Sequence, residues 1–234
     1  MTVLLGLLLI STAPDGEIPS LPASEVAARV EQADARRLSQ LAGYTGLRRY
    51  TLNNERFGKH AELVVRITFT PPAAKRFEVV SSAGSKVVIN RILRKMVDAE
   101  TEAAGVSRDT RISRANYDFA DAGKETINGR RCYVLEAKPK QDTKFLFRGK
   151  IWVDSQDFAI VRIQGAPAKN PSFWIRKTEF VHTYDKFGPV WLATRNESHT
   201  DARIFGATTV TIEYFEYRVR TDMAQSESQA SQQR

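Results

Sequence analysis

Few side chains in this sequence are of the types that usually carry catalysis or bind metals. It has three histidines, His60, His182 and His199, and a single cysteine, Cys132. The histidines do not have the spacing of paired metal ligands. A lone cysteine can form neither an intramolecular disulfide nor a thiolate cluster. We therefore expect no metal site, no cofactor and no catalytic residue.

A predicted hairpin over residues 172–200 keeps two of the histidines apart. Antiparallel pairing across its turn places His182 opposite about Leu192 and His199 opposite about Ile175. The two imidazoles then cannot act together, which again indicates a chain that is not an enzyme.

The absence of catalytic sequence motifs also indicates a chain that is not an enzyme. The chain has no G-x-S-x-G, H-E-x-x-H or P-loop pattern. Gly84-Ser85-Lys86 precedes a predicted helix whose first N–H groups could bind an anion, although such a segment more often only caps the helix. Cys132 alternates with Val134 along a predicted strand, which is typical of a packed thiol rather than a nucleophile.

The charge balance is basic but dispersed. The 234 residues include 35 Lys and Arg against 27 Asp and Glu, a formal net charge of +8. Such a charge attracts nucleic acid, anionic lipid headgroups or acidic proteins at long range. The basic residues alternate with acidic ones, as in Arg66, Lys75, Arg76 and Glu78, which favours solvated faces. Nucleic-acid binding would require a cytoplasmic location, and the N-terminus predicts export, so nucleic acid is not an expected partner.

The N-terminus resembles a secretory signal. The apolar stretch 3–10 is too short to span a bilayer as a helix, and the small residues 11–13 follow it directly. A buried N-terminal strand is the alternative. We expect a signal peptide and spacer over 1–22, one domain over 23–220, a disordered polar tail over 221–234, and a periplasmic location.

Hydrophobic periodicity predicts the elements of the domain. A helix is expected over 24–41 with Ser24 as its cap, followed by a meander of strands 47–54, 62–70 and 75–82. The period then becomes helical over 85–104. The predicted apolar stripe of this helix comprises Val88, Ile89, Ile92, Met96, Ala99 and Ala103.

Everything from about residue 115 to 219 is predicted to form strands, with Asn128-Gly129 as a tight hairpin turn. Strands 145–153 and 207–219 carry apolar side chains on both faces, so both faces of the sheet need a cover. The surface that helices leave uncovered is either a dimer contact or the wall of a ligand cavity.

This order of elements resembles the LolA-like family of outer-membrane lipoprotein carriers over roughly residues 24–219. The resemblance rests on the segments TPPAAKRFEVVSS at 70–82, INGRRCYVLEAKPK at 127–140 and GKIWVDSQDFAIVRIQG at 149–165. It implies an α+β fold: a curved antiparallel β-sheet, or half-barrel, with two or more helices packed on its concave face. The pattern is also similar to the lipid-carrier-like sensor domains of envelope-stress regulators.

In one respect the chain departs from the carriers that it resembles. They have an arginine a few residues ahead of the aromatic residue of the third strand, which helps control the lid. Here Ala73 stands in the corresponding place, with Lys75 and Arg76 nearer to Phe77.

The expected function is that of an exported, non-enzymatic carrier, which binds the acyl chain of a lipid or lipoprotein and moves it across the periplasm between membrane-anchored donor or acceptor proteins. The alternative is a periplasmic sensor that binds such a signal and modulates a partner protein. The expected ligand wall comprises Leu63, Val65, Ile67, Phe69, Phe77, Val79, Ile89, Ile92, Met96, Phe147, Trp152, Trp174 and Trp191, although core packing also accounts for the tryptophans. Helix 85–104 would be a lid, and the expected anion-binding rim comprises Arg76, Lys86, Arg91 and Arg94.

Overall fold

The computed structural model describes residues 18–72, 74–103, 110–170, 173–204 and 206–221. The predicted signal sequence and nearly all of the predicted tail lie outside these residues. The side chains of 99–103, including Ala99 and Ala103 of the predicted stripe, are also outside the description.

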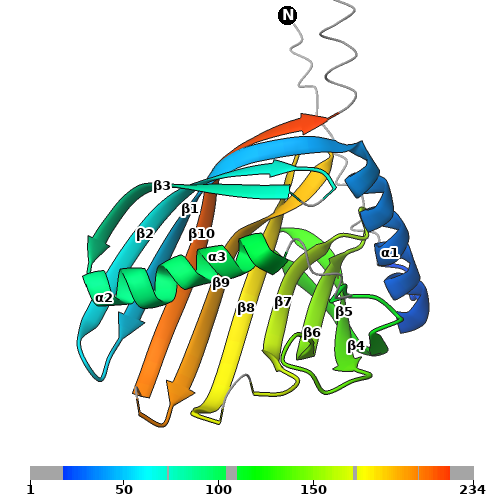
Figure 1. Cartoon of the computed structure of the whole chain (residues 1–234). Coiled ribbons are helices and arrows are strands. Elements are labelled where there is room, and N and C mark those ends of the chain that lie inside the picture. The colour runs from blue at the N-terminus through cyan, green and yellow to red at the C-terminus, as the bar shows by residue number, and fades with distance from the viewer. Residues whose placement is uncertain (1–17, 73, 104–109, 171–172, 205, 222–234) are drawn as a thin grey trace, which may run out of the picture.

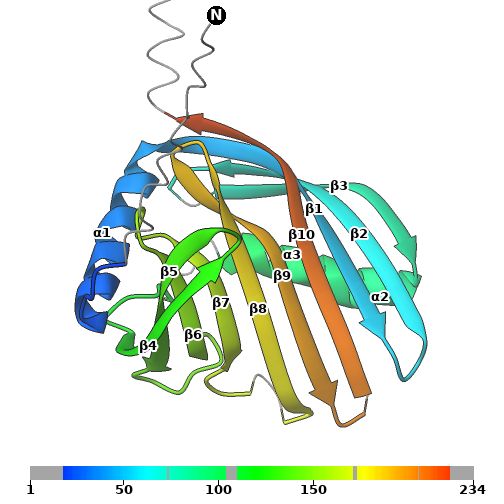
Figure 2. The ribbon, with the colours of Figure 1, turned by 180° about the vertical axis from the view of Figure 1, so that it is seen from behind.

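The described chain forms one antiparallel sheet of ten strands in the order β3-β2-β1-β10-β9-β8-β7-β6-β5-β4. The sheet is strongly curved and does not close into a barrel (Figures 1 and 2), so the predicted α+β half-barrel is confirmed. The strands are β1 Leu41–Asn54, β2 Lys59–Thr70, β3 Ala74–Gly84, β4 Tyr117–Ile127, β5 Arg130–Pro139, β6 Phe147–Asp154, β7 Ile160–Pro167, β8 Ile175–Phe187, β9 Val190–Ala202 and β10 Gly206–Thr221.

Two helical segments lie on the concave side (Figure 1). The first is α1, Ala23–Gln40, close to the predicted bounds. The second runs without a break through α2 (Lys86–Val88), the π-helical turn Ile89–Leu93 and α3 (Arg94–Ala103). The predicted cap was wrong: Pro22 is the N-cap residue and its carbonyl accepts the first backbone hydrogen bonds, which places Ser24 inside the first turn.

Helix α1 covers the end of the sheet formed by β4 to β7. Its residues Val26, Ala27 and Val30 are buried and belong to one hydrophobic cluster with side chains of these strands. The strand residues of this cluster include Tyr117, Tyr133, Leu135, Phe147, Ile151, Val153 and Ile163. This end of the concave face is therefore filled by ordinary core packing.

The second helical segment covers the opposite end, over β2, β1 and β10. It buries Val88, Ile89, Leu93 and Val97 against strand residues Tyr50, Leu52, Ala61, Leu63 and Val65. The predicted stripe was wrong at Ile92, which is 42% exposed. The reason is the π-helical turn, whose i→i+5 hydrogen bonds add a residue to the turn, so that the inward face continues at Leu93 and Val97.

Two strand predictions need correction. β1 begins directly after α1 at Leu41, six residues before the predicted start at 47, and Gly43 and Gly46 lie inside this strand at its two register shifts against β10. Gly43 has φ +138°, and a Cβ there would lie 2.7 Å from the carbonyl oxygen of Phe69. Glycine therefore lets β1 twist against β2 without ending the pairing.

The β8–β9 hairpin is the second correction. Its turn is Gly188-Pro189, so the register places His182 opposite Asn196 and His199 opposite Glu179 rather than Leu192 and Ile175. The two histidines still do not meet.

Candidate functional site

The middle of the concave face, between the two helix-covered ends, holds a cavity of about 750 Å³. It lies under the C-terminal half of α1, beside the segment 110–115, and over strands from both halves of the sheet. Its apolar lining comprises Ala35, Leu38, Leu41, Tyr44, Phe69, Ile112, Ala115, Ile160, Ile163, Tyr184, Val190, Trp191 and Leu192. A cavity of this size is within the range of small-molecule sites.

The sheet side of the cavity is aromatic and aliphatic. The rings of Tyr44 and Phe69 stack with centroids 5.1 Å apart, and Val190 is buried beside Tyr44 in the same cluster. Burial raises the pKa of Tyr184 to about 12, so its phenol stays neutral at physiological pH. This wall therefore offers dispersion contacts and no charge to a ligand.

The α1 side of the cavity carries three charged groups, Glu31, Asp34 and Arg37, and each is paired with another side chain, while Arg111 of the segment 110–115 also lines the cavity. Glu31 accepts hydrogen bonds from Arg114, including one of 3.0 Å to Oε2, and this arginine lowers the pKa of the Glu31 carboxyl. Arg37 pairs with Asp34 and donates a 3.0 Å hydrogen bond to the carbonyl of Asp157. These contacts hold the C-terminal half of α1 in place beside the cavity.

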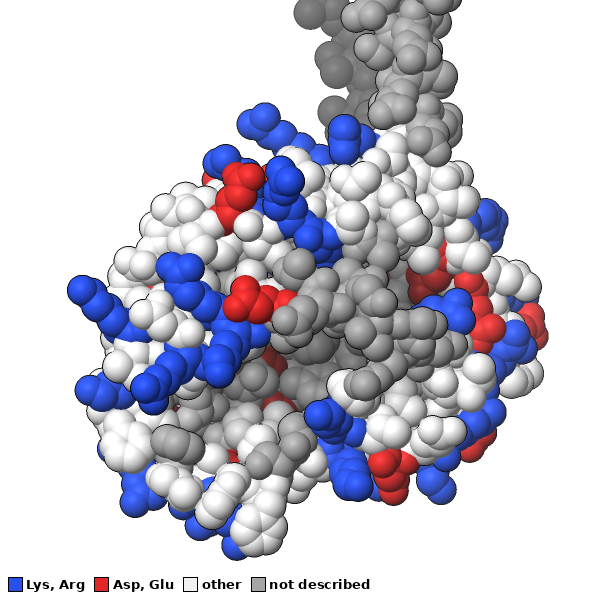
Figure 3. Space-filling view, viewed as in Figure 1, with Lys and Arg blue, Asp and Glu red and all other residues white. Residues whose placement is uncertain are grey.

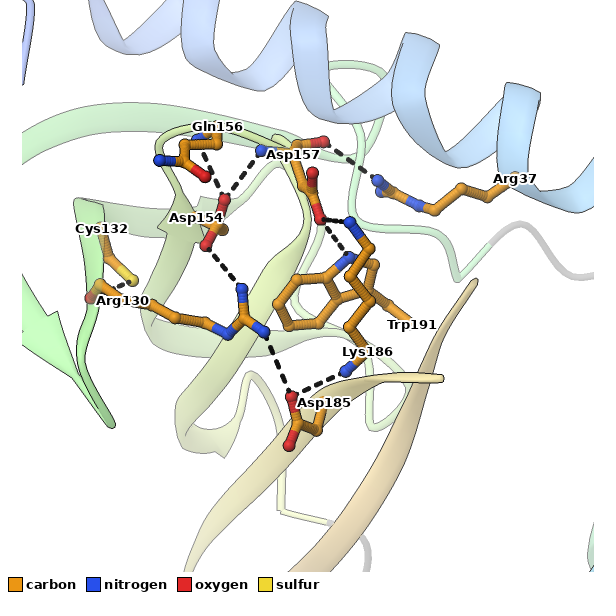
Figure 4. Close-up of polar contacts among 9 residues, drawn as sticks. All are labelled: Arg37, Arg130, Cys132, Asp154, Gln156, Asp157, Asp185, Lys186 and Trp191. Atoms are coloured by element: carbon orange, nitrogen blue, oxygen red, sulfur yellow. Dashed lines mark hydrogen bonds and ion pairs between the residues drawn. The ribbon is translucent and has the colours of Figure 1, made fainter. Parts of the chain in front are cut away.

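A polar network behind the cavity positions Trp191 (Figure 4). The indole Nε1 donates a 3.1 Å hydrogen bond to Oδ2 of Asp157, which also lies 2.7 Å from Nζ of Lys186. The guanidinium of Arg130 lies 4.8 Å from the indole centroid and 3.6 Å from the buried carboxylate of Asp154. Trp191 thus borders the cavity as a fixed wall.

The same network joins three parts of the chain. Oδ1 of Asp154 accepts hydrogen bonds from the backbone N–H groups of Gln156 and Asp157 in the β6–β7 turn, at 2.9 and 2.7 Å (Figure 4). Arg130 of β5 also reaches Asp185 of the β8–β9 hairpin, at 3.7 Å. The turn, the hairpin and α1 therefore support one edge of the cavity together.

A second cavity of about 270 Å³ adjoins the first, since both are lined by Thr110, Ile112 and Ile163. Its wall includes Phe147, Phe180 and His182. The ring centroids of Phe180 and His182 lie 4.7 Å apart. Burial lowers the pKa of His182 to about 4, so its imidazole is neutral near pH 7 and extends the apolar surface.

A third cavity, of about 490 Å³, lies between β3 and α3 and brings six of the predicted residues together. Leu63, Val65, Phe77 and Val79 of the expected ligand wall line it together with Arg76 and Arg94 of the expected anion rim. Its apolar and basic groups thus lie at the outer edge of the sheet, apart from the central cavity.

The remaining predicted residues are dispersed. Phe69 and Trp191 line the central cavity and Phe147 lines the adjoining one. Ile67 and Ile89 are buried in core clusters, and Met96 packs partly against one of them. Trp152 lies in a separate cluster with Cys132, Val134 and Val161, because alternation along β6 turns it away from Ile151 and Val153.

Four of the remaining predicted residues face solvent. Trp174 is exposed in the β7–β8 connection, and Lys86, Arg91 and Ile92 are exposed on the second helical segment. Lys and Arg side chains gather over this segment (Figure 3). Lys86 and Arg91 do not line any of the three cavities described above.

Sequence reasoning missed most of the central cavity. Leu38 is not among the expected ligand residues, although it is 63% exposed and lines the cavity. Tyr44 precedes the predicted start of its strand at 47, and Tyr184, Val190 and Leu192 flank the turn whose predicted register needed correction. An apolar residue near the end of α1 was the one signal available.

The described residues offer few side chains that could bind a metal ion or take part in redox chemistry. No group of three or more His, Cys, Asp or Glu among them could hold a metal ion. Burial, with the nearby Asp154 carboxylate, raises the pKa of the Cys132 thiol to about 11, which keeps it protonated at neutral pH. Within the described ranges, no helix is both long enough and apolar enough to cross a bilayer.

Several solved structures are similar to this chain. A DUF1329 family protein from Desulfovibrio piger is 12% identical, with a TM-score of 0.44 over 86% of this chain and 94% of that one. A LolA superfamily protein from Nitrosomonas europaea is 10% identical, with a TM-score of 0.43 over the same shares. A domain proposed to belong to an outer membrane lipoprotein-sorting protein of Vibrio parahaemolyticus is 12% identical, with a TM-score of 0.46 over 85% and 94%.

TM-scores below 0.5 at these identities say nothing about ligands, so what this chain binds has to follow from its own side chains. A search of curated proteins found no match. A family model described as an uncharacterized protein matches residues 95–226, more than half of the chain, and the chain belongs to that family.

Proposed function

We propose that this protein is a non-enzymatic periplasmic carrier, which binds an acyl chain of a lipid or lipoprotein in the central cavity and hands it on. The observation that supports this most is the 750 Å³ cavity with an apolar sheet wall, which α1 lines on one side, while α1 and the second helical segment are each already packed on a core of their own. Neither helix needs the cavity filled for its own burial. The space is therefore available to a ligand.

The chemistry of the lining favours a hydrocarbon chain. The sheet wall is apolar with a neutral Tyr184, and the charged groups on the α1 side are paired with protein partners. The polar groups at the segment 110–115, among them Arg111 and Ser113, lie on one side of the cavity, where a lipid headgroup would meet them. Each buried methylene contributes about 0.8 kcal/mol, which is about a fourfold gain in affinity. A chain of a dozen methylenes would supply about 10 kcal/mol before the cost of association.

A chain-length series tests the proposal. Fluorescent fatty acids of increasing length should bind with affinities that rise about fourfold per methylene until the cavity is full. Native mass spectrometry of protein purified from its own envelope should show a co-purifying lipid. Absence of binding at every length, or affinity that does not depend on length, would contradict the proposal.

Paired variants locate the binding site. Ala35 of α1 is exposed and lines the cavity, whereas Gln32 is exposed on the same helix outside that lining. Ala35→Trp should fill the cavity and weaken acyl binding by at least about tenfold, since it displaces two or more methylenes. Gln32→Trp should bind within about twofold of the wild type, since it displaces none. Equal binding by both variants would place the ligand elsewhere.

A second pair tests the apolar character of the site. Leu38 and Val87 are 63% and 64% exposed, and only Leu38 lines the cavity. An aspartate at either place should leave the fold intact, because neither side chain is part of the core. Leu38→Asp should weaken binding of the longest bound fatty acid, and Val87→Asp should not. If the two variants bind the fatty acid with equal affinity, the acyl chain does not contact the α1 side of the cavity.

A further inference from the structure

Apolar side chains also gather at the end of the half-barrel formed by three strand connections. The connections are β1–β2, β7–β8 and β9–β10, and their tips follow one another along the lower edge of the sheet in Figures 1 and 2. Four large apolar residues at these tips are exposed: Phe173 by 75%, Trp174 by 53%, Phe57 by 51% and Ile204 by 47%. We call these four residues the tip rim.

The tip rim is one connected surface rather than three separate loops. Arg56 donates a 3.0 Å hydrogen bond from Nη1 to the carbonyl of Ile204, which joins the β1–β2 and β9–β10 tips. The backbone N–H of Arg203 donates a 2.8 Å hydrogen bond to the carbonyl of Trp174, which joins the β9–β10 and β7–β8 tips. These hydrogen bonds therefore connect the three tips that carry the exposed side chains.

Basic groups lie among these apolar side chains. The guanidinium of Arg203 lies 4.7 Å from the ring centroid of Phe173, and that of Arg56 lies 5.8 Å from the ring of Phe57. Lys59 at the start of β2 and Lys169 in the β7–β8 connection are exposed nearby in the chain. At the β8 end, Arg176 forms an ion pair with Asp201 at 3.4 Å, and Glu55 is an exposed acidic residue in the β1–β2 connection. These two acidic residues stand against five basic ones, Arg56, Lys59, Lys169, Arg176 and Arg203, so the local balance is positive.

We propose that the tip rim docks this protein onto an anionic membrane surface. Tryptophan and phenylalanine beside arginine and lysine match the water–lipid boundary, where aromatic rings sit at headgroup depth and cations meet lipid phosphates. Tips in a row can all enter a flat bilayer to a shallow depth. The three connections that carry the four side chains lie along one edge of the sheet, so a flat surface can meet all three tips.

The tip rim is distinct from the site proposed for the acyl chain. Its four residues do not line the central cavity. Docking and acyl binding are therefore separable, and Ala35→Trp, which fills the cavity, should dock as the wild type does.

Co-sedimentation with vesicles tests the docking. The full chain should bind vesicles of phosphatidylcholine mixed with phosphatidylglycerol, bind phosphatidylcholine alone more weakly, and lose affinity as salt is raised. Phe173→Ser combined with Trp174→Ser should weaken binding by at least about tenfold, because two exposed aromatic side chains no longer enter the lipid. The matched control is Val80→Ser with Val87→Ser, which removes two apolar side chains that are 51% and 64% exposed elsewhere.

Charge variants test the basic part of the rim. Each basic residue at an anionic surface contributes about fivefold, so Arg56→Gln with Arg203→Gln should weaken binding about 25-fold. Arg66→Gln with Arg218→Gln makes the same change of charge at exposed positions away from the tips and should have little effect. Trp174→Phe should retain docking but lose the blue shift of tryptophan emission that vesicles induce in the wild type.

Two results would overturn the docking proposal. One is a wild type that binds no phosphatidylglycerol vesicles. The other is a tip-rim variant that binds as tightly as its matched control, which would place any vesicle contact on another surface such as the basic face of the second helical segment. Because vesicle binding does not need the cavity, failure of acyl binding would leave these outcomes unchanged.

Discussion

Replacing His182 by phenylalanine should make the fold less sensitive to acid. The imidazole lies in the wall of the smaller cavity, with its ring 4.7 Å from that of Phe180, and burial lowers its pKa to about 4. In the unfolded chain the pKa of histidine is about 6.5. The unfolded state therefore takes up a proton first as the pH falls, and the wild type loses stability from about pH 6.5 down to about pH 4.

The size of the effect follows from these two pKa values. One unit of difference is worth about 1.36 kcal/mol, so the full loss approaches about 3 kcal/mol below pH 4. Between pH 7 and pH 5 the expected loss in the free energy of unfolding is about 2 kcal/mol. For a domain of this size that corresponds to a fall in Tm of about 4 to 8 °C.

Urea unfolding at pH 7 and pH 5 measures the effect. His182→Phe should lose less free energy of unfolding than the wild type over this interval by about 2 kcal/mol, since phenylalanine takes up no proton. His199→Gln is the control, because the His199 side chain is exposed and bonded to Glu197 and Thr209. Equal losses in His182→Phe and the wild type would show that His182 is not a buried neutral group.

Three further substitutions or measurements probe the fold. Gly149→Ala should lower the free energy of unfolding by about 2 kcal/mol in urea titrations, because the new Cβ would lie 2.1 Å from the carbonyl oxygen of Gln164; an unchanged midpoint would mean that the two strands are not this close. The Cys132 thiol should resist alkylation at pH 8 in the folded protein and react only in denaturant, since its pKa is about 11, and fast labelling of native protein would refute its burial. Trp191→Phe should lower stability by about 1 kcal/mol in thermal melts by removing the hydrogen bond to Asp157, whereas an unaltered Tm would show that the network does not depend on the indole.

Much of the fold could be predicted from local pattern. Period and breakers located both helical segments and most strands, and Asn128-Gly129 has the positive φ angles, 50° and 77°, of the predicted tight hairpin turn. Burial of Leu63, Val65 and Ile67 followed from simple alternation. These features depend on neighbours within a few residues, so they can be predicted without knowledge of the tertiary fold.

The cavity residues could not be predicted in the same way. Alternation places Ile151 and Trp152 on opposite faces of β6, but it does not say which face is concave. Likewise, the inward face of the second helical segment continues at Leu93 rather than Ile92 because of a π-helical turn, which the hydrophobic periodicity of the sequence does not predict.

By itself the sequence determined the type and order of the elements, the surplus of apolar strand faces and the scarcity of catalytic side chains, because these follow from residue type and short-range spacing. Only the tertiary structure decided which apolar side chains pack under a helix, which line a hollow and which stand exposed at the tips. Apolar attraction has no preferred direction, so the curvature of the sheet and the lengths of two helices select the contacts of each side chain.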